Sequence, residues 1–188
     1  MAVGNVYSYK QLSPGRIRIL ILKPSTRFED RIECTLHEAT LGVKPRQRIS
    51  YEAVSYVWGS PVGDQEIFCD GKIMLVTRNC LSALRHFRRK RGSRALWVDA
   101  ICIDQLSNSE KNHQVSLMGD IYALARKVLI WLGEENSEAQ VFMRKLRWYG
   151  VYLKWQEKTK IFPTLEFNKG TIGHFIFYYE ANRAITRG

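Results

Sequence analysis

The sequence predicts an α/β fold, with a largely parallel central sheet and helices on both of its faces. Between residues 73 and 149, strand-like and helix-like segments alternate, which is the order of right-handed βαβ units. Two short apolar runs, at 95–103 and 127–132, lack the polar alternation of a half-exposed strand. Such runs are typical of strands in a parallel sheet that is covered on both faces.

The residues before this region predict further strands. Residues 16–22 (RIRILIL) are apolar and β-branched and stop at Lys23-Pro24, and a second strand is expected at 32–36. Residues 51–58 (YEAVSYVW) predict a third strand, which Gly59-Ser60-Pro61 ends. We expect the hairpin-like strands at the N-terminus to be antiparallel additions to the parallel sheet.

A hairpin and a helix are predicted next. Asp70-Gly71 favours a tight turn between strands at 66–69 and 73–76, because both residues accept a positive φ. Thr77 is the expected N-cap of the helix that follows, and this helix is expected to end before Gly92. The apolar face of the helix consists of Cys80, Leu81, Leu84 and Phe87.

The remaining elements complete the alternation. Ser107 and Glu110 form a capping-box pattern at the start of a second helix. A buried strand is expected at 127–132 and a further helix at 137–149, and residues 170–179 suggest an isolated strand. The apolar stripe of the second helix consists of Val115, Met118, Ile121, Tyr122 and Ala125.

The composition is that of a globular domain. The chain has 188 residues, of which 45% are apolar and 25% charged, and these fractions argue against disorder. The four cysteines are spread singly, so reduced thiols in a cytoplasmic or nuclear protein fit best. The N-terminus is too polar for a signal peptide, and no apolar run reaches the roughly 18 residues of a membrane span.

The net charge of +11 is unevenly distributed along the chain. Residues 141–188 hold nine Lys and Arg against three Asp and Glu, and half of the aromatic residues. We therefore divide the chain into an α/β domain at 1–150 and a basic, aromatic tail at 151–188. The tail is either a final helix and strand that complete the core, or an incomplete C-terminal part of the domain.

A basic cluster follows the first predicted helix. Cations near a helix C-terminus interact favourably with the helix dipole, so a solvated helix end accounts for the cluster. The run Arg88–Arg91 also fits a nuclear-localisation signal or a nucleic-acid patch, although no nucleic-acid motif accompanies it. A basic surface of this kind also suits an acidic protein partner. The cluster comprises Arg85, Arg88, Arg89, Lys90, Arg91 and Arg94.

Ligands of parallel α/β sheets bind beyond the carboxyl ends of the strands. Three loops occupy that position, at 55–64, 99–105 and 133–135, and they converge if their strands are neighbours. The candidate catalytic residues there are Glu110 and Asp99. The candidate ligand-binding residues are Ser55, Trp58, Asp104 and Gln105.

Each of these candidates has a structural alternative. Asp99 interrupts a buried run, so it either caps a helix or pairs with an arginine, or it is a site carboxylate with a perturbed pKa. Asp104 and Gln105 either cap the next helix or face a ligand. Glu110 either serves the capping box or faces the crevice, and the Ser55 hydroxyl either bonds a neighbouring backbone group or contacts a ligand.

Several other chemistries lack support in the sequence. There is no Gly-x-Ser-x-Gly elbow for a serine nucleophile, and neither a GxGxxG nor a Walker A phosphate loop is present. The four histidines form no pattern that would bind a metal, and no metal site is expected. Cys102 lies in an apolar stretch and is expected to be an inert core thiol.

Three blocks, in order, resemble the fungal HET (heterokaryon incompatibility) domain. They are residues 51–59 (YEAVSYVWG), residues 96–105 (LWVDAICIDQ) and residues 125–133 (ARKVLIWLG). The resemblance covers about residues 7–140. HET proteins usually continue, beyond residue 150 or so, into an Arg-x-Trp-x-x-Gln-Glu element, and this sequence lacks it.

The resemblance implies a filamentous-fungal protein of non-self recognition, whose HET domain triggers programmed cell death. It also implies a distant relation to TIR domains, and hence a flavodoxin-like fold. Because some TIR domains cleave NAD with a glutamate in the crevice, NAD becomes a candidate substrate, with Trp58 stacking on a ring. Three functions stay open: a signalling module acting through self-association and protein partners, an NAD glycohydrolase and, least supported, a nucleic-acid-binding module.

Overall fold

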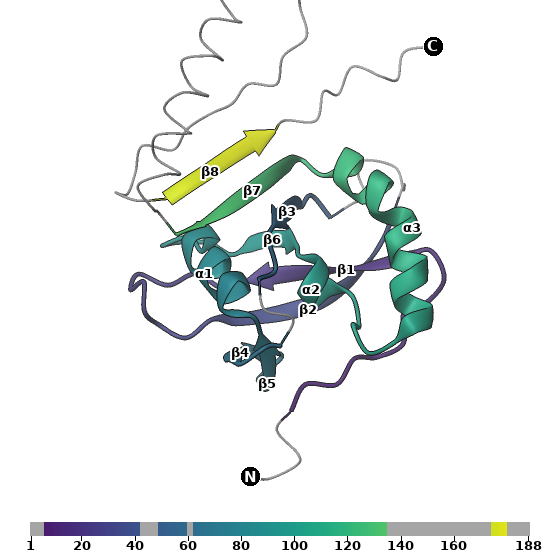
Figure 1. Ribbon diagram of the computed structural model, residues 1–188, viewed down its shortest axis with the longest axis horizontal. Helices are drawn as coiled ribbons and strands as arrows, with labels where there is room; N and C mark the ends of the chain where they lie inside the picture. The colour runs from purple at the N-terminus through teal and green to yellow at the C-terminus, as the bar shows by residue number, and fades with distance from the viewer. Residues whose placement is uncertain (1–5, 42–48, 60–61, 135–173, 180–188) are drawn as a thin grey trace, which may run out of the picture.

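The computed structural model describes residues 6–41, 49–59, 62–134 and 174–179 of the chain. Within these residues, one mixed sheet of eight strands has the order β5-β4-β2-β1-β6-β3-β7-β8 and is accompanied by three helices (Figure 1). In chain order the elements are β1 (Arg16–Leu22), β2 (Glu33–Thr40), β3 (Glu52–Tyr56), β4 (Gln65–Cys69), β5 (Lys72–Val76), α1 (Arg78–Phe87), β6 (Arg94–Trp97), α2 (Asp99–Cys102), α3 (Asn108–Leu124), β7 (Lys127–Glu134) and β8 (His174–Tyr179).

The α/β class is confirmed, but the prediction of a largely parallel sheet is wrong. Only β2–β4, β3–β6 and β3–β7 are parallel pairs, whereas the pairs β1–β2, β1–β6, β4–β5 and β7–β8 are antiparallel. The predicted parallel core is thus limited to β6-β3-β7. A flavodoxin-like arrangement is not what this strand order shows, because β1 lies antiparallel in the centre of the sheet.

The position of β1 has a simple physical reason. Ile17, Ile19, Leu20 and Leu22 are all at most 1% exposed, so both faces of this strand are covered. A strand buried on both faces is apolar whichever direction its neighbours run, so its composition does not reveal its pairing. The N-terminal strand is therefore a central strand of the sheet.

Helices do cover both faces of the sheet, as predicted. Tyr56 pairs in register with Trp131 of β7, and Ala53 pairs with Trp97 of β6, so the two indoles point to opposite faces. Phe87 of α1 contacts Trp131 edge-on at 6.3 Å, and Tyr122 of α3 contacts Trp97 at 5.6 Å. Figure 1 accordingly shows α1 and α3 well apart around the sheet.

Backbone angles confirm the predicted turn, and individual hydrogen bonds confirm the two predicted helix caps. Asp70 and Gly71 adopt φ values of 51° and 75°, which is the backbone of a tight hairpin turn between β4 and β5. The Thr77 hydroxyl accepts a hydrogen bond from the Cys80 backbone N–H at 3.2 Å and begins α1. The Ser107 hydroxyl accepts one from the Glu110 N–H, also at 3.2 Å, and begins α3.

Two predicted elements differ from the structure. The apolar run 95–103 is not one strand, because β6 ends at Trp97 and Asp99 begins the single helical turn α2. Ile101 and Cys102 are fully buried on that turn, so the helix needs the same apolar residues as the expected strand. On α3, Val115 is 55% exposed and Gln114 is buried instead, where its side-chain amide donates to the Arg16 carbonyl at 2.9 Å.

The C-terminal predictions are only partly covered by the described residues. The strand expected within 170–179 is present as β8, and it is not isolated, because it pairs antiparallel with β7. The helix expected at 137–149, the boundary at residue 150 and most of the tail lie outside the described residues. Within the described part of the chain, no helix is both long and apolar enough to cross a membrane.

Candidate functional site

Two of the three predicted loops meet at the carboxyl ends of the neighbouring strands β3 and β6. Trp58 follows β3, and Asp99 follows β6 and begins α2. The Trp58 indole N–H donates a hydrogen bond to the Asp99 carboxylate at 3.0 Å. We call this pair and the side chains around it the carboxyl-edge site. Of the third loop, Gly133 is described, whereas Glu135 lies outside the described residues.

Asp99 is partly buried and holds its own helical turn. Its second carboxylate oxygen accepts the Ala100 N–H at 2.7 Å, and its carbonyl accepts the side-chain amide of Gln105 at 3.0 Å. Burial raises the pKa of Asp99 above its ordinary value, and the hydrogen bonds from Trp58 and Ala100 oppose this rise. No Lys or Arg among the described residues forms an ion pair with it. Asp99 is thus the first residue of α2 and not its cap, which is Val98, and its charge lacks a cationic partner in that region.

The charge of Asp99 acts on three further side chains, which the sequence reasoning did not select as site residues. Burial, together with the negative charge of Asp99, raises the pKa of Tyr56, and it raises the pKa of Cys80 and of Tyr122 to about 12. The raised pKa values favour the neutral form of all three groups and argue against nucleophilic roles for them. The only signal in the sequence was that Tyr56 lies two residues before Trp58.

Ser55 hydrogen-bonds the Tyr122 side chain of α3, whereas its structural alternative described a bond to a neighbouring backbone group. The Tyr122 hydroxyl donates to the Val54 carbonyl at 3.1 Å, and a hydrogen bond with Ser55 partly offsets the rise in the pKa of Tyr122. These contacts tie α3 to β3. Ser55 is thus beside the carboxyl-edge site, but it bonds to a tyrosine of the core rather than to an activating base.

The Glu110 carboxylate is committed to a different cluster. It receives Arg18 through two hydrogen bonds, of 2.5 and 3.1 Å, and accepts the Asp104 N–H at 2.8 Å. The side chains of Arg18 and Glu110 are only 4% and 11% exposed. Although burial alone would raise the pKa of Glu110, the bonds from Arg18 and Asp104 hold it below its ordinary value. The predicted capping box is incomplete, because the carboxylate binds Arg18 and Asp104 in place of the Ser107 N–H.

Arg18 connects this ion pair to the N-terminal segment. Its guanidinium also donates to the carbonyls of Cys102 at 3.1 Å and Lys10 at 2.5 Å, and it lies 4.8 Å from the centre of the Tyr9 ring. The sequence reasoning missed this residue. The available signal was a charged residue in the apolar stretch 16–22, which only a buried partner permits.

The two remaining candidates have structural contacts of their own. Asp104 accepts the Leu106 N–H through its side chain at 3.0 Å and so closes the turn before α3. Gln105 binds the Asp99 carbonyl, as described above. Neither contact is the predicted cap of the next helix, because Ser107 is the N-cap of α3.

A second buried carboxylate was also missed. Glu52 of β3 is 3% exposed and lies between the guanidinium groups of Arg94 and Arg126, the latter at 2.5 Å. Arg94 also donates to the Phe87 carbonyl at 2.9 Å. The charge of Arg94, which belongs to the predicted basic cluster, is therefore used inside the domain rather than on a nucleic-acid surface.

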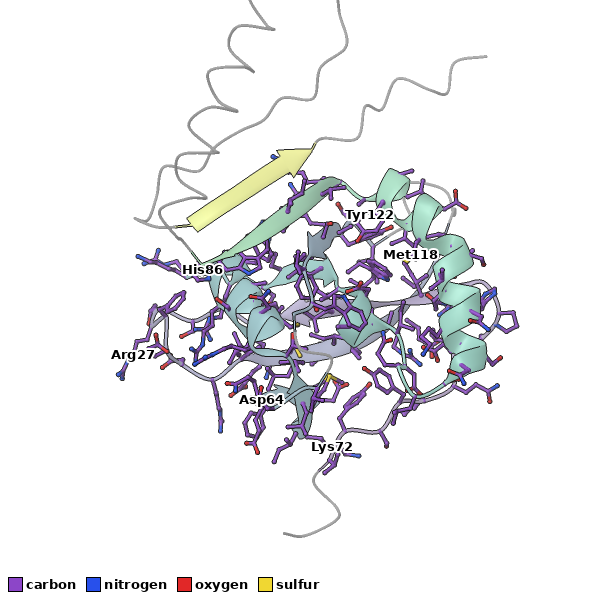
Figure 2. The ribbon with its side chains drawn as sticks, viewed as in Figure 1. Arg27, Asp64, Lys72, His86, Met118 and Tyr122 are labelled. Carbon is purple, nitrogen blue, oxygen red and sulfur yellow. The ribbon has the colours of Figure 1, made fainter. Side chains whose placement is uncertain are left out.

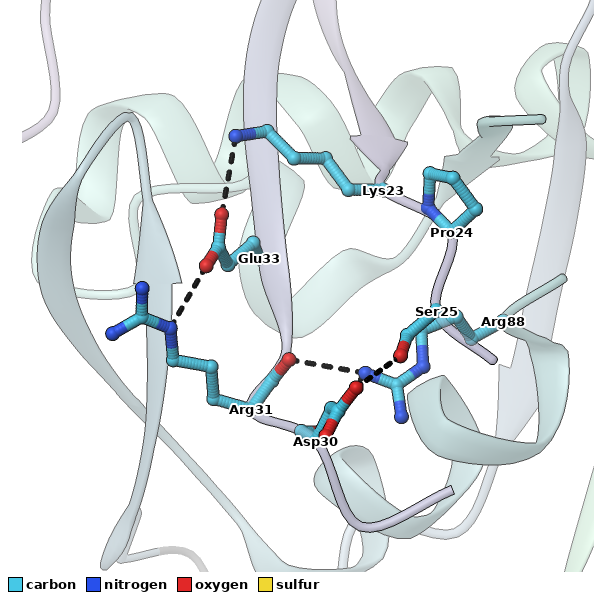
Figure 3. A pocket seen from close by; sticks show the side chains of 7 residues that line it. All are labelled: Lys23, Pro24, Ser25, Asp30, Arg31, Glu33 and Arg88. Atoms are coloured by element: carbon cyan, nitrogen blue, oxygen red, sulfur yellow. Dashed lines mark hydrogen bonds and ion pairs between the residues drawn. The ribbon is translucent and has the colours of Figure 1, made fainter. Parts of the chain in front are cut away.

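Three clefts of the described region lie away from the carboxyl-edge site. The largest of three, about 430 Å³, lies between the β1–β2 connection and Arg88, where Glu33 binds Lys23 at 3.2 Å and Arg31 at 2.8 Å (Figure 3). A second, of about 300 Å³, adjoins it, and a third, of about 270 Å³, lies beside Tyr7. None of these three is lined by Trp58 or Asp99.

Comparison with known proteins places these features in a family. A family model described as "Heterokaryon incompatibility protein (HET)" matches residues 51–175. A curated relative, "Heterokaryon incompatibility protein 6, OR allele" of Neurospora crassa, is 35% identical over 163 residues. That match covers 78% of this chain and 23% of the relative, so the chain spans about a quarter of the relative's length. No solved structure matches the chain.

Proposed function

The chain belongs to the heterokaryon incompatibility (HET) family, and on this premise we propose that it is a signalling domain of fungal non-self recognition. In this proposal the domain triggers programmed cell death through contacts with protein partners or with further copies of itself. The name of the Neurospora relative, a heterokaryon incompatibility protein, supports a role in non-self recognition. The domain would act in the cytoplasm, and the four reduced, buried cysteines support a reducing compartment.

The hydrogen bonds and the burial of the Glu110 carboxylate favour a signalling function over a catalytic one. Its oxygens are occupied by Arg18 and by the Asp104 N–H, and its side chain is 11% exposed. A carboxylate that stabilises a reacting centre must reach the substrate, and Glu110 would first have to leave its buried partner. The structural role of Glu110 thus supports a domain whose carboxylates hold its shape and whose surface carries the signal.

Growth arrest on expression in a filamentous fungus tests this proposal. Glu110→Gln keeps an acceptor for the Asp104 N–H, and Asp99→Asn keeps an acceptor for the Trp58 indole, while each removes one negative charge. At equal amounts of folded protein, both variants are expected to arrest growth as the unchanged chain does, although Glu110→Gln leaves Arg18 without its counter-charge. If Asp99→Asn protein accumulates in folded form and growth continues, the domain needs that charge, and the signalling proposal fails.

The second candidate function is hydrolysis of NAD at the carboxyl-edge site, as the TIR resemblance suggests. Asp99 supports it, because this carboxylate has no cationic partner in the described region and lies against the Trp58 indole. In the reaction, the bond between the ribose carbon and the nicotinamide nitrogen breaks, and its electron pair leaves with nicotinamide. Water then adds to the ribose carbon and releases a proton. The ionised Asp99 would stabilise the positive charge that develops on the ribose.

Release of nicotinamide by the purified chain distinguishes the two candidates. Hydrolysis predicts release that Asp99→Asn reduces by at least about 100-fold, which is the size of a typical electrostatic contribution to catalysis. Glu110→Gln is the matched control, because it removes the same charge at a carboxylate already bound to Arg18. Absence of release at high protein concentration, with growth arrest retained, would exclude hydrolysis as the killing mechanism.

A further inference from the structure

We infer that a basic cleft between the β1–β2 connection and the end of α1 binds an acidic segment of a partner protein. The inference goes beyond the proposed function, because it requires neither chemistry at Asp99 nor any particular outcome of the growth assay. The basic cleft has a volume of about 300 Å³ and is lined by Ser25, Thr26, Arg27, Phe28, Arg85, His86, Arg88 and Lys90.

The charge of the cleft is strongly one-sided. Its lining contains four Lys and Arg side chains and no Asp or Glu. The two segments that form it, 23–33 and 85–91, contain eight Lys and Arg and three Asp and Glu, a net charge of +5. Arg27 has an 84% exposed side chain and Lys90 is exposed, so both reach solvent at the rim. The local field therefore favours a negatively charged partner.

Arg88 fixes the shape of the cleft. Its guanidinium donates to the carbonyls of Arg27, Phe28, Asp30 and Arg31, at distances between 2.7 and 3.0 Å. One arginine thus holds four carbonyl groups of the same connection in place. A surface that is already ordered loses less conformational entropy on binding, so the free-energy cost of docking a partner on it is smaller.

An aromatic column forms the apolar part of the cleft. Phe28 is 47% exposed and lies edge-on to His86, with ring centres 4.8 Å apart. His86 in turn stacks on the buried indole of Trp131, with centres 4.6 Å apart. Figure 2 shows Arg27 and His86 on the same side of the domain. An apolar side chain of the partner would pack on Phe28, and the surrounding cations would bind its acidic neighbours.

The distribution of charge favours a protein over a nucleic acid as the occupant. Carboxylates are interspersed with the cations, since Glu29 pairs with Arg85 at 2.9 Å and Asp30 lies 3.8 Å from Arg27. A continuous phosphate backbone would meet these negative groups, whereas a peptide places its charges at intervals. A single exposed ring also differs from the series of stacking rings with which proteins bind single strands.

Fluorescence polarisation with the full chain and a fluorescein-labelled peptide of repeated Glu-Glu-Phe units tests the inference. We expect binding at low salt that weakens as salt rises, and no binding of the matching Lys-Lys-Phe peptide. The double variant Arg27→Ala and Lys90→Ala is expected to raise the Kd by about tenfold, and Phe28→Ala by about fivefold. All three side chains are exposed, so these variants should unfold at the temperature of the unchanged chain.

The double variant Lys10→Ala and Lys72→Ala is the matched control. It removes the same two positive charges from the third cleft, and Figure 2 shows Lys72 well apart from Arg27. We expect it to leave the Kd unchanged within about twofold. If both double variants weakened binding equally, the binding would depend only on net charge, and the inference would be overturned. Tighter binding of single-stranded DNA than of the peptide, lost in the Arg27 and Lys90 variant, would instead assign the cleft to nucleic acid.

Discussion

Removal of the Glu110 carboxylate should destabilise the domain severely. In Glu110→Ala, Arg18 keeps the carbonyls of Cys102 and Lys10 but loses both of its bonds to a counter-charge. Its side chain is 4% exposed, so water does not readily replace the carboxylate. Breaking a buried pair by removing one partner typically costs about 3–5 kcal/mol. Because the two carbonyls remain and Glu110 lies near the surface, we expect the lower end, about 3 kcal/mol.

Urea denaturation followed by tryptophan fluorescence measures this loss. With a denaturant dependence of about 2 kcal/mol per molar urea, the midpoint should fall by about 1.5 M. The matched control is Glu38→Ala, which breaks a pair with Arg16 at 3.5 Å whose side chains are 39% and 37% exposed. That change should cost about 0.5 kcal/mol or less. A loss below about 1 kcal/mol for Glu110→Ala, or one equal to the control, would refute the buried-pair account.

The same pair gives the stability a definite pH dependence. The folded-state pKa of Glu110 lies below its unfolded value of about 4.3. The pair therefore contributes its full stability above the unfolded pKa, and the contribution is lost as pH falls through the folded pKa. Unchanged chain and Glu110→Ala should consequently differ most near neutral pH and converge as pH falls through the folded pKa of Glu110. A constant difference across that range would contradict the ionised pair.

Four further results are expected. Thr77→Ala removes the α1 cap and should cost about 1 kcal/mol in urea denaturation, and an unchanged midpoint would contradict the cap. Trp58→Phe removes the indole N–H and should raise the pKa of Asp99 further, as read from a carbon-13 NMR titration, whereas a fall would contradict the bond. Cys80 should resist thiol reagents at pH 8 until the chain unfolds, because burial raises its pKa to about 12, and fast labelling would contradict this burial. Arg88→Lys keeps the charge but loses the planar fork, so amide exchange in the β1–β2 connection should quicken, and unchanged exchange would argue against the clamp.

Local chemistry was readable from the sequence wherever a short range of residues determines it. The Asp70-Gly71 turn and the Thr77 and Ser107 caps depend on neighbours within three residues, and all three were predicted. The meeting of the loops after β3 and β6 was predicted on the condition that their strands are neighbours, and the structure shows these two strands as a parallel pair. Of the candidate site residues, Trp58 and Asp99 are brought into direct hydrogen-bond contact there.

Long-range pairing was not readable from the sequence. Arg18 and Glu110 lie 92 residues apart, and Glu52 and Arg94 lie 42 apart, so no local pattern links them. Most of the apolar side chains of strand β1 and of turn α2 are buried, and such apolar sequences are the same for either pairing direction and for strand or helix. Charged residues within apolar strands, such as Arg18 and Glu52, were the one signal of buried ion pairs.

The rate of hyphal growth during expression of Asp99→Asn protein tests the central claim most directly. Signalling through protein contacts predicts the same arrest as with the unchanged chain, at equal amounts of folded protein. This substitution keeps an acceptor for the Trp58 indole while it removes the charge that hydrolysis needs and the second acceptor, which binds the Ala100 N–H. Normal growth at that protein level would contradict the account and assign the killing to chemistry at the carboxyl-edge site.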